Sequence, residues 1–144
     1  MSQMHQYVSK LNFNTLGIGL QDITEDVRAV VAKSEVQTGV VHLTIMHTSA
    51  SLIIQENASL EVRRDILTFL DKLVPMGKNL YEHSFEGRDD MPAHLKAMVT
   101  NTTLTLSIVE SLLQLGTWQS IFLVEHRESH HLRHVMVHCV GQKV

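Results

Sequence analysis

The chain has 144 residues, of which 44% are apolar and 19% charged, and its net charge is −3 with histidine neutral. This length suits one domain, residues 1–144, with one hydrophobic core. Because the chain has no Lys/Arg run, we expect no nucleic-acid partner. Its single cysteine, Cys139, allows no internal disulfide and suits a reducing compartment. The first ten residues contain no apolar signal core, and no apolar run approaches the roughly 20 residues that span a bilayer, so we expect a soluble cytoplasmic protein without a membrane partner.

Two strands and a helix are predicted at the start of the chain. Residues 4–12 and 16–23 are predicted to be strands, with a turn near residues 14–15. Thr24 is placed to cap a helix that runs to about Ser34, with acidic residues in its first turn, where negative charge suits the helix dipole.

The middle of the chain contains a strand followed by two helices. Gly39 is predicted to break the chain before the strand "VVHLTIMHTS", residues 40–49. An apolar stripe at helical spacing then predicts a helix over residues 59–74, which stops before Pro75. A third, short helix is expected to begin near Asp90, with proline in its first turn, where the missing N–H costs nothing.

The last third of the chain is predicted to consist of strands. "TLTLSI" alternates cleanly, "QLGTWQSIFLVEHR" turns at Gly116 and continues as a long strand, and "HLRHVMVHCV" pairs with it through a hairpin at residues 128–131. With roughly seven strands and about three helices, the fold class is α+β: an antiparallel, β-rich sandwich with helices on one side.

Two of these strands carry apolar faces that end in charged or polar side chains. In the first, Val41, Leu43 and Ile45 lead to His47, and in the second, Ile121 and Leu123 lead to Glu125 and Arg127. Because an unpaired buried charge is costly, such groups are paired or line a cleft. The pattern predicts a shared polar pocket at one end of the core, and the alternative is that both strands simply reach solvent there.

A second cluster lies in "HSFEGRDDMPAHLK". If the helix begins near Asp90, then Asp90 and His94 are four residues apart on one face, and His83 lies on the preceding loop. Two histidines and a carboxylate are plausible ligands for zinc or another divalent metal. The alternative is an acidic helix start beside two surface histidines, since neither an HExxH nor a CxxC pattern is present.

Two further observations concern other kinds of site. Ser49 and Ser51 are nucleophiles by type, but no GxSxG elbow surrounds them. His134 and His138 share a strand face with Leu132, Met136 and Val140, and could line a subunit interface.

Three blocks of the sequence resemble the signature blocks of the YjbQ family, which is often labelled secondary thiamine-phosphate synthase. The blocks are "HTSASLIIQEN", "EGRDDMPAHLKA" and "LGTWQSIFLVEHR"; they occur in the family's order, and the resemblance covers nearly the whole chain. The chain departs from the family pattern at Ser59-Leu60, where the family usually has Asp-Pro, and at Ser120, where it often has glycine. These departures fall at turns and helix starts and leave the polar positions intact.

The resemblance implies a β-rich α+β fold, a homotrimer and a polar, metal-assisted site. Carried over to this chain, the family's polar positions are three sets: the catalytic candidates His47, Glu125 and Arg127, the substrate-binding candidates Thr48, Ser49 and Asn57, and the metal-binding candidates His83, Asp90 and His94. In this hypothesis Glu125 is an acid or base held by Arg127, and His47 is a second proton-transfer group.

The activity implied by the resemblance is weak thiamine-phosphate synthesis, in which an aminopyrimidine diphosphate joins a thiazole phosphate and pyrophosphate is lost. A divalent metal, zinc or magnesium, and Arg127 would stabilise the departing diphosphate. Two alternatives stay open: a non-catalytic protein that binds a phosphorylated metabolite or anion, and a metal-dependent hydrolase of a small ester or phosphate.

Overall fold

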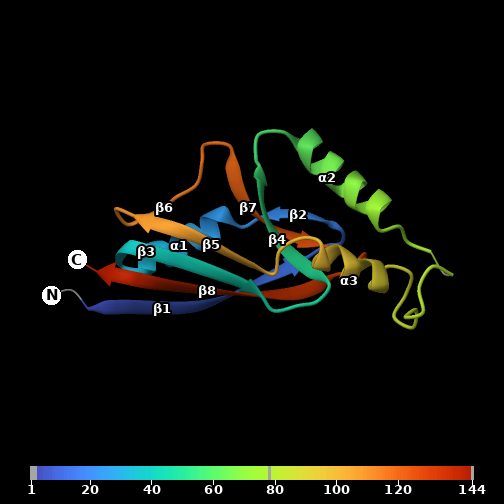
Figure 1. The fold of residues 1–144 in the computed structure, drawn as a ribbon, viewed down its shortest axis with the longest axis horizontal. Coiled ribbons are helices and arrows are strands. Elements are labelled where there is room, and N and C mark those ends of the chain that lie inside the picture. The colour runs from blue at the N-terminus through green and yellow to red at the C-terminus, as the bar shows by residue number, and fades with distance from the viewer. Residues whose placement is uncertain (1–2, 78, 144) are drawn as a thin grey trace.

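A computed structural model describes residues 3–77 and 79–143 (Figure 1). Within these residues, three helices and eight strands confirm the α+β class, with one strand more than predicted. In chain order the elements are β1 (Met4–Thr15), β2 (Gly19–Asp22), α1 (Thr24–Ser34), β3 (Val36–Ile45), β4 (Ala50–Glu56), α2 (Leu60–Leu73), α3 (Asp90–Met98), β5 (Thr103–Val109), β6 (Leu112–Leu113), β7 (Gln119–Glu125) and β8 (His131–Lys143). None of the helices in this described part of the chain has the length and apolar character needed to cross a membrane.

The strands form two antiparallel sheets. One has five strands in the order β1-β8-β3-β5-β6, and the other has three in the order β2-β7-β4. Strands that follow one another in sequence are therefore often in different sheets, as β7 and β8 are. The predicted hairpin between these two strands is wrong: β7 pairs with β2 and β4, whereas β8 pairs with β1 and β3.

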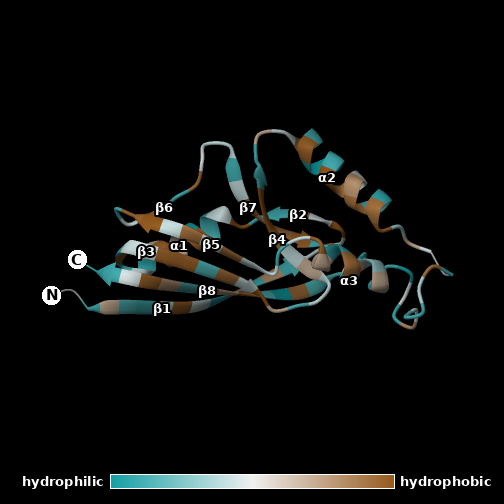
Figure 2. Cartoon of the chain, viewed as in Figure 1, coloured by the Kyte–Doolittle hydropathy of each residue, from teal (hydrophilic) through white to brown (hydrophobic). Residues whose placement is uncertain are grey.

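The main core lies where the two sheets and α1 meet. Alternate residues of β3 point into it, and Val41, Leu43 and Ile45 are buried as the pattern predicted. Val27, Val30 and Val31 of α1 are buried against the same core, which also receives Val135 and Val137 from β8. Figure 2 shows the alternation of apolar and polar residues along the strands of the five-stranded sheet.

Strand β7 is buried on both faces, which explains why its sequence is continuously apolar. Ile121 and Leu123 point into the main core. Phe122 and Val124 point the other way and pack with Ile66 of α2, the helix that lies outside the three-stranded sheet (Figure 1). A strand covered on both faces reads as an apolar run rather than as an alternation.

Two strand boundaries differ from the prediction for tertiary reasons. Gly39 does not break the chain: β3 begins at Val36 and continues through it. Gly39 pairs with Gly141 of β8, and a Cβ at position 39 would lie 2.1 Å from the carbonyl oxygen of Val140. The glycine therefore permits a close approach of two strands. Similarly, β1 does not turn near residues 14–15, because it remains paired with β8 as far as Thr15.

The helices begin and end close to the predicted positions. Ser59 is the N-cap of α2, and its hydroxyl accepts a hydrogen bond from the backbone N–H of Glu61. The prediction that Thr24 caps α1 is wrong: it is the first helical residue, and its hydroxyl accepts a hydrogen bond from the backbone N–H of Ile121 instead. This side chain therefore joins α1 to β7 rather than closing its own helix.

Replacing Ile121 with alanine is expected to lower the free energy of unfolding by about 2–5 kcal/mol. Ile121 has no exposed surface in the main core, so the shorter side chain leaves a cavity. The change is measured by urea denaturation, with Leu112→Ala, at a residue 64% exposed, as the matched control. A loss for Ile121→Ala no larger than that of the control would mean that this face of β7 is not packed as described.

Candidate functional site

Three strands bring polar side chains to one end of the main core. His47 follows β3, Glu125 ends β7, and Arg133 lies near the start of β8 on the same face as the buried Val135. Arg133 Nε donates to Glu125 Oε1 at 2.7 Å, and its Nη2 donates to the other carboxylate oxygen. Its Nη1 lies 3.3 Å from His47 Nδ1. The predicted convergence of His47 and Glu125 therefore occurs, with Arg133 between them.

The surroundings of Glu125 keep its carboxylate ionised. Burial alone would raise the pKa of Glu125, but hydrogen bonds from Arg133, the Thr15 hydroxyl and the Arg127 backbone N–H outweigh it and lower the pKa. The side chain is 2% exposed and its partner Arg133 4%. Glu125 is thus a buried acceptor whose two oxygens already take four donors, which makes it unsuited to the predicted role of an acid or base.

His47 is similarly engaged. Its Nε2 accepts a hydrogen bond from the backbone N–H of His134 at 2.8 Å. Burial and the nearby charge of Arg133 lower the pKa of His47, so the ring is neutral near pH 7. A neutral imidazole that accepts at Nε2 carries its proton on Nδ1, so the 3.3 Å approach of Arg133 Nη1 to Nδ1 is not a hydrogen bond. The bond from His134 anchors the chain between β3 and β4.

The prediction that the Arg127 side chain holds Glu125 is wrong, because this side chain has other partners. Its Nε donates to Asp89 Oδ2 at 3.0 Å and its Nη1 to Asp90 Oδ1 at 2.7 Å, while Nη2 donates to the carbonyl of Glu86. The physical reason is direction: after β7 ends at Glu125, the chain leaves the core face and passes beside the start of α3. Arg127 therefore fixes the loop before α3 and one oxygen of Asp90.

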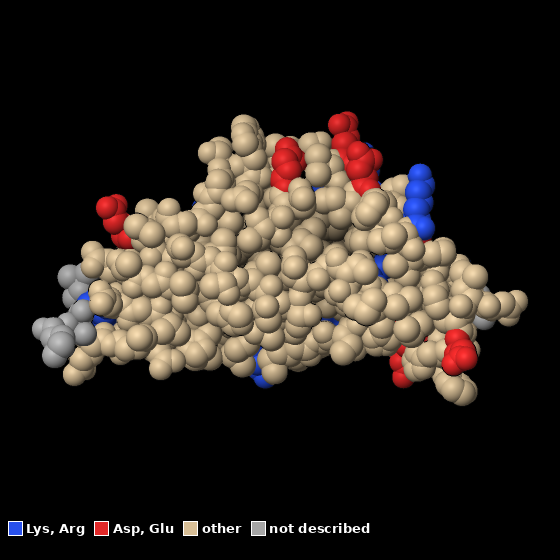
Figure 3. Space-filling model, viewed as in Figure 1, with Lys and Arg blue, Asp and Glu red and all other residues tan. Residues whose placement is uncertain are grey.

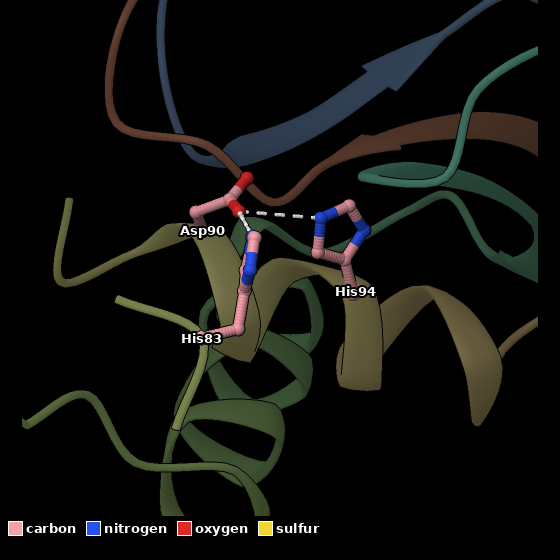
Figure 4. A group of neighbouring side chains, drawn as sticks. All are labelled: His83, Asp90 and His94. Carbon is pink, nitrogen blue, oxygen red and sulfur yellow. Dashed lines mark hydrogen bonds and ion pairs between the residues drawn. The ribbon is translucent and has the colours of Figure 1, made fainter. Parts of the chain in front are cut away.

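His83, Asp90 and His94 do come together (Figure 4). Asp90 and His94 lie on one face of α3, and His83 reaches them from the preceding loop. His83 Nε2 is 2.8 Å and His94 Nε2 3.3 Å from Asp90 Oδ2. One ligand atom from each residue lies within 4.8 Å of the other two. Asp90 is 1% exposed and the two histidines are 47% and 31% exposed, so the cluster has a buried floor and an open side.

The contacts around this cluster suit metal ligands. A carbonyl oxygen only accepts, so the contact of 2.9 Å between His94 Nδ1 and the Thr48 carbonyl places the proton on Nδ1. The lone pair of His94 Nε2 is therefore free to face Asp90. Arg127 holds the other Asp90 oxygen, and such outer contacts typically orient the ligands of a metal site. His83, Asp90 and His94 could hold one divalent ion.

Of the three predicted substrate-binding residues, two lie at the site and one does not. Thr48 lies beside the metal-binding candidates through its carbonyl, and the buried hydroxyl of Ser49 accepts from Arg133 Nη2 at 3.0 Å. Asn57 lies elsewhere: its amide donates to the Ser120 hydroxyl and the Gln119 carbonyl, at the opposite end of β7. At 3.4 Å per residue, the length of β7 separates it from Glu125 by roughly 20 Å. The structure does not bring Asn57 to the site.

Several buried polar residues near the site were missed, among them Thr15 beside Glu125 and Asp89 beside Arg127. Arg133, Lys96 and His126 are 3%, 3% and 1% exposed. For Arg133 a signal existed, because it shares a strand face with Val135 and Val137, the same parity that had singled out His47 and Glu125. His126 likewise follows the buried Phe122 and Val124 on the other face of its strand, whereas Lys96 gave no such signal, since lysine on a short helix usually faces solvent.

The stability of the protein is expected to fall as the pH is lowered from 6.5 to 4. Burial and the nearby charge of Lys96 lower the pKa of His126 from 6.5 to about 4. The unfolded chain therefore takes up a proton at a higher pH than the folded chain does. The contribution of the neutral His126 ring to the free energy of unfolding is fully present above pH 6.5 and decreases by roughly 3 kcal/mol as the pH falls to about 4.

Urea denaturation across this pH range tests the expectation. The free energy of unfolding of His126→Phe, which cannot titrate at this position, should decrease less as the pH falls. His47, whose pKa is also lowered, reduces the stability of both proteins at low pH in the same way. If the two proteins lost stability in parallel, the buried neutral His126 would not be the cause.

Fold and site together define a class: a two-sheet α+β protein with a buried Glu–Arg pair at one end of its core and a His–Asp–His cluster beside it. The family described as "UPF0047 protein YjbQ-like" matches residues 9–142, and the chain belongs to this family. The resemblance drawn from the three sequence blocks is thereby confirmed.

Curated relatives and solved structures support the assignment. The chain is 45% identical over 140 residues to UPF0047 protein sll1880 of Synechocystis sp., which covers 97% of this chain and 94% of the relative. It is 39% identical to UPF0047 protein YjbQ of Escherichia coli O157:H7, with 84% of this chain and 88% of the relative covered. The crystal structure of a YbjQ-like protein from Sulfolobus solfataricus P2 is similar with a TM-score of 0.90 at 28% identity, covering 96% of this chain and 99% of that chain.

Proposed function

We propose that the protein is an enzyme that uses one divalent metal ion, zinc or magnesium, to act on a small phosphorylated metabolite. The observation that carries this proposal is the convergence of His83 Nε2, Asp90 Oδ2 and His94 Nε2 within 4.8 Å of one another. Two histidines and one carboxylate with an open side are a common ligand set of catalytic metal sites. A metal bound there would polarise a phosphoryl oxygen or activate a water molecule.

The residues around the cluster favour a phosphorylated substrate. A cavity of about 280 Å³ lies beside it and is lined by His83 and Arg88, among others. The Arg88 side chain is 64% exposed, so its guanidinium is accessible to a phosphate, although it also pairs with Glu128 at 3.1 Å. Cationic groups that meet the charge of a phosphate or diphosphate stabilise its departure.

The buried pair at the end of the core has a positioning role in this proposal. Glu125 holds Arg133, and Arg133 donates to the carbonyl and hydroxyl of Ser49. This fixes the segment whose Thr48 carbonyl orients His94. We therefore assign Glu125 and His47 to the support of this segment, and Arg127 to the placement of Asp90, rather than to proton transfer.

Two reactions fit a metal-assisted site of this kind. The first is the one implied by the family label: thiamine-phosphate synthesis, in which a carbon–nitrogen bond forms between an aminopyrimidine and a thiazole phosphate and pyrophosphate leaves. The second is hydrolysis of a small phosphate or ester, which the open side of the cluster favours because water has access to it. A protein that binds such a metabolite without turnover is the remaining alternative.

The experiment removes the metal with a chelator and then restores zinc, magnesium or manganese separately. Release of pyrophosphate from an aminopyrimidine diphosphate with a thiazole phosphate measures the first reaction, and a panel of chromogenic phosphates and esters measures the second. We expect one of the two activities to return with one of the metals. Ligand-induced thermal stabilisation without product would favour the binding protein, and no response to any metal would contradict the proposal.

We also propose that the protein is a homotrimer, as the family resemblance implies. The outer face of the five-stranded sheet carries Val8, Val40, Met46 and Leu132, which are 40–53% exposed. Figure 3 shows few charged atoms over the area of β1, β3 and β8 on the face in view. Depletion of charge is typical of the centre of subunit interfaces. Light scattering should give three times the 16.3 kDa mass of one chain, and a monomer mass would contradict the proposal.

A further inference from the structure

A second cavity lies on the other side of α3 from the His–Asp–His cluster. Lys96 is two residues from His94, which on a helix places it on nearly the opposite face. The cavity has a volume of about 610 Å³ and is bounded by α2, the following loop, Lys96 and His126. Cavities of roughly 300–1,000 Å³ are typical of small-molecule sites. None of the three metal-binding candidates lines it.

Lys96 brings a poorly compensated positive charge to this cavity. Its side chain is 4% exposed, and its one ion-pair partner among the described residues is Asp71, at 3.5 Å from Nζ to Oδ1. The Asp71 side chain is 65% exposed and therefore hydrated. An ammonium group has three donors, and a single long contact with a solvated carboxylate offsets little of the cost of burying it. Lys96 can therefore accept an additional anionic partner.

His126 offers a directed hydrogen-bonding group beside Lys96. Its Nε2 lies 2.9 Å from the Ser51 hydroxyl, which lies 2.6 Å from the Thr100 hydroxyl. Thr100 donates its single proton to the Lys96 carbonyl at 2.8 Å, so Ser51 donates to Thr100 and His126 Nε2–H donates to Ser51, which leaves Nδ1 unprotonated. Nδ1 has no protein partner in the described part of the chain. The neutral ring can therefore accept one hydrogen bond from a ligand at Nδ1.

The opposite wall of the cavity is apolar. Leu67 and Leu70 contribute from α2, and Pro75 and Met76 from the loop that follows. Arg88 and Glu128 also line the cavity, but they pair with each other at 3.1 Å, so Lys96 is the cation with the weakest partner there. An apolar wall that faces this cation selects a ligand with an organic body and an acidic end, because a fully hydrated inorganic ion would leave the apolar surface unused.

We propose that this cavity binds a small organic anion, whose carboxylate or phosphate group pairs with Lys96 while its apolar body packs against α2. The site is separate from the metal-binding candidates and does not depend on the proposed enzymatic function. The two sites share α3, which carries Asp90 and His94 on one face and Lys96 on the other.

Isothermal titration calorimetry with three probes of similar shape tests the proposal: benzoate, phenyl phosphate and benzyl alcohol. We expect at least one of the two anions to bind at least about ten-fold more tightly than the neutral alcohol, a difference that reports the Lys96 charge. Comparison of benzoate with phenyl phosphate identifies the acidic group that the cavity prefers. Lys96→Met keeps the length of the side chain without its charge and should bring the anion and the alcohol to equal affinity.

Two controls separate this site from other cationic sites. Lys72→Met removes an exposed charge from α2, outside the cavity, and should leave the preference for the anion unchanged. His94→Ala alters the metal-binding candidates and should also leave it unchanged, so that failure of the metal proposal and failure of this one are distinguishable.

A wild-type measurement avoids any dependence on the folding of Lys96→Met. In nitrogen NMR spectra of the histidine rings, the Nδ1 resonance of His126, which lines the cavity, should shift saturably with the anion, and with benzyl alcohol only at roughly ten-fold higher concentrations. Equal binding of anions and alcohol, an anion preference that survives in folded Lys96→Met, or the absence of saturable anion binding at tens of millimolar would each overturn the proposal.

Discussion

Replacing Arg133 with methionine is expected to lower the free energy of unfolding by about 3–5 kcal/mol, the largest effect of any single change proposed for this protein. Methionine has a similar reach but no charge, so Glu125 remains buried at 2% exposure without its guanidinium partner. Ser49 loses its hydrogen bonds from Arg133 at the same time. Urea denaturation at pH 7 measures the loss.

Two matched variants identify the origin of this effect. Arg28→Met breaks an ion pair with Glu25 whose side chains are 49% and 83% exposed, and it should cost at most about 1 kcal/mol. Adding Glu125→Gln to Arg133→Met removes the uncompensated charge and should recover part of the stability. If the double variant were as unstable as the sum of its single changes, lost packing rather than buried charge would be responsible.

Replacing His94 with alanine is expected to weaken the binding of a divalent metal by at least about 100-fold. Changes to groups that only support a metal ligand already cost about 10–100-fold, and loss of a ligand costs more. Wild-type protein purified without chelators should contain close to one metal ion per chain, and the variant should contain almost none. Elemental analysis and calorimetric titration with zinc measure the two quantities.

The stability of the variant distinguishes loss of a ligand from loss of the fold. His94 is 31% exposed, so its replacement should change the unfolding free energy far less than Arg133→Met does. His42→Ala, which removes an imidazole from the outer sheet face beside Thr105, is the matched control and should retain the metal. Equal metal content in wild-type and His94→Ala protein would show that this residue is not a ligand.

The two proposed effects are coupled through the segment between β3 and β4. Arg133 holds Ser49, and the neighbouring Thr48 carbonyl fixes the tautomer of His94. We therefore expect a folded Arg133 variant to bind the metal more weakly than wild-type protein, although Arg133 does not touch the cluster. Such supporting contacts are as much a part of a metal site as the ligands themselves.

Features governed by local interactions could be predicted well from the sequence. The first two helices begin and end, and the third begins, within about a residue of the predicted positions, because helical periodicity and caps depend on neighbours within a few positions. The same reason explains the metal-binding candidates: Asp90 and His94 are one helical turn apart, so a single helix places them on one face. The approach of His83 depends on a loop, and the sequence alone left it open.

The placement of β7 and β8 could not be predicted from neighbouring residues. A short connection between two apolar strands favours a hairpin, but β7 is buried on both faces and pairs in the three-stranded sheet, while β8 pairs with β1 and β3. Gly39 was mistaken for a break for a related reason, since its close contact is with Gly141, about a hundred residues away in sequence.

The amino-acid sequence by itself determined the family, the α+β class, the helices and the apolar faces that end in His47 and Glu125, because these depend on local periodicity and on residues within single segments. Only the tertiary structure decided that Arg133, and not Arg127, neutralises Glu125, that Asn57 lies at the far end of β7, and that Lys96 and His126 border one cavity. These outcomes depend on which strands pair and in what register, and pairing energies are distributed over contacts between residues that are distant in sequence.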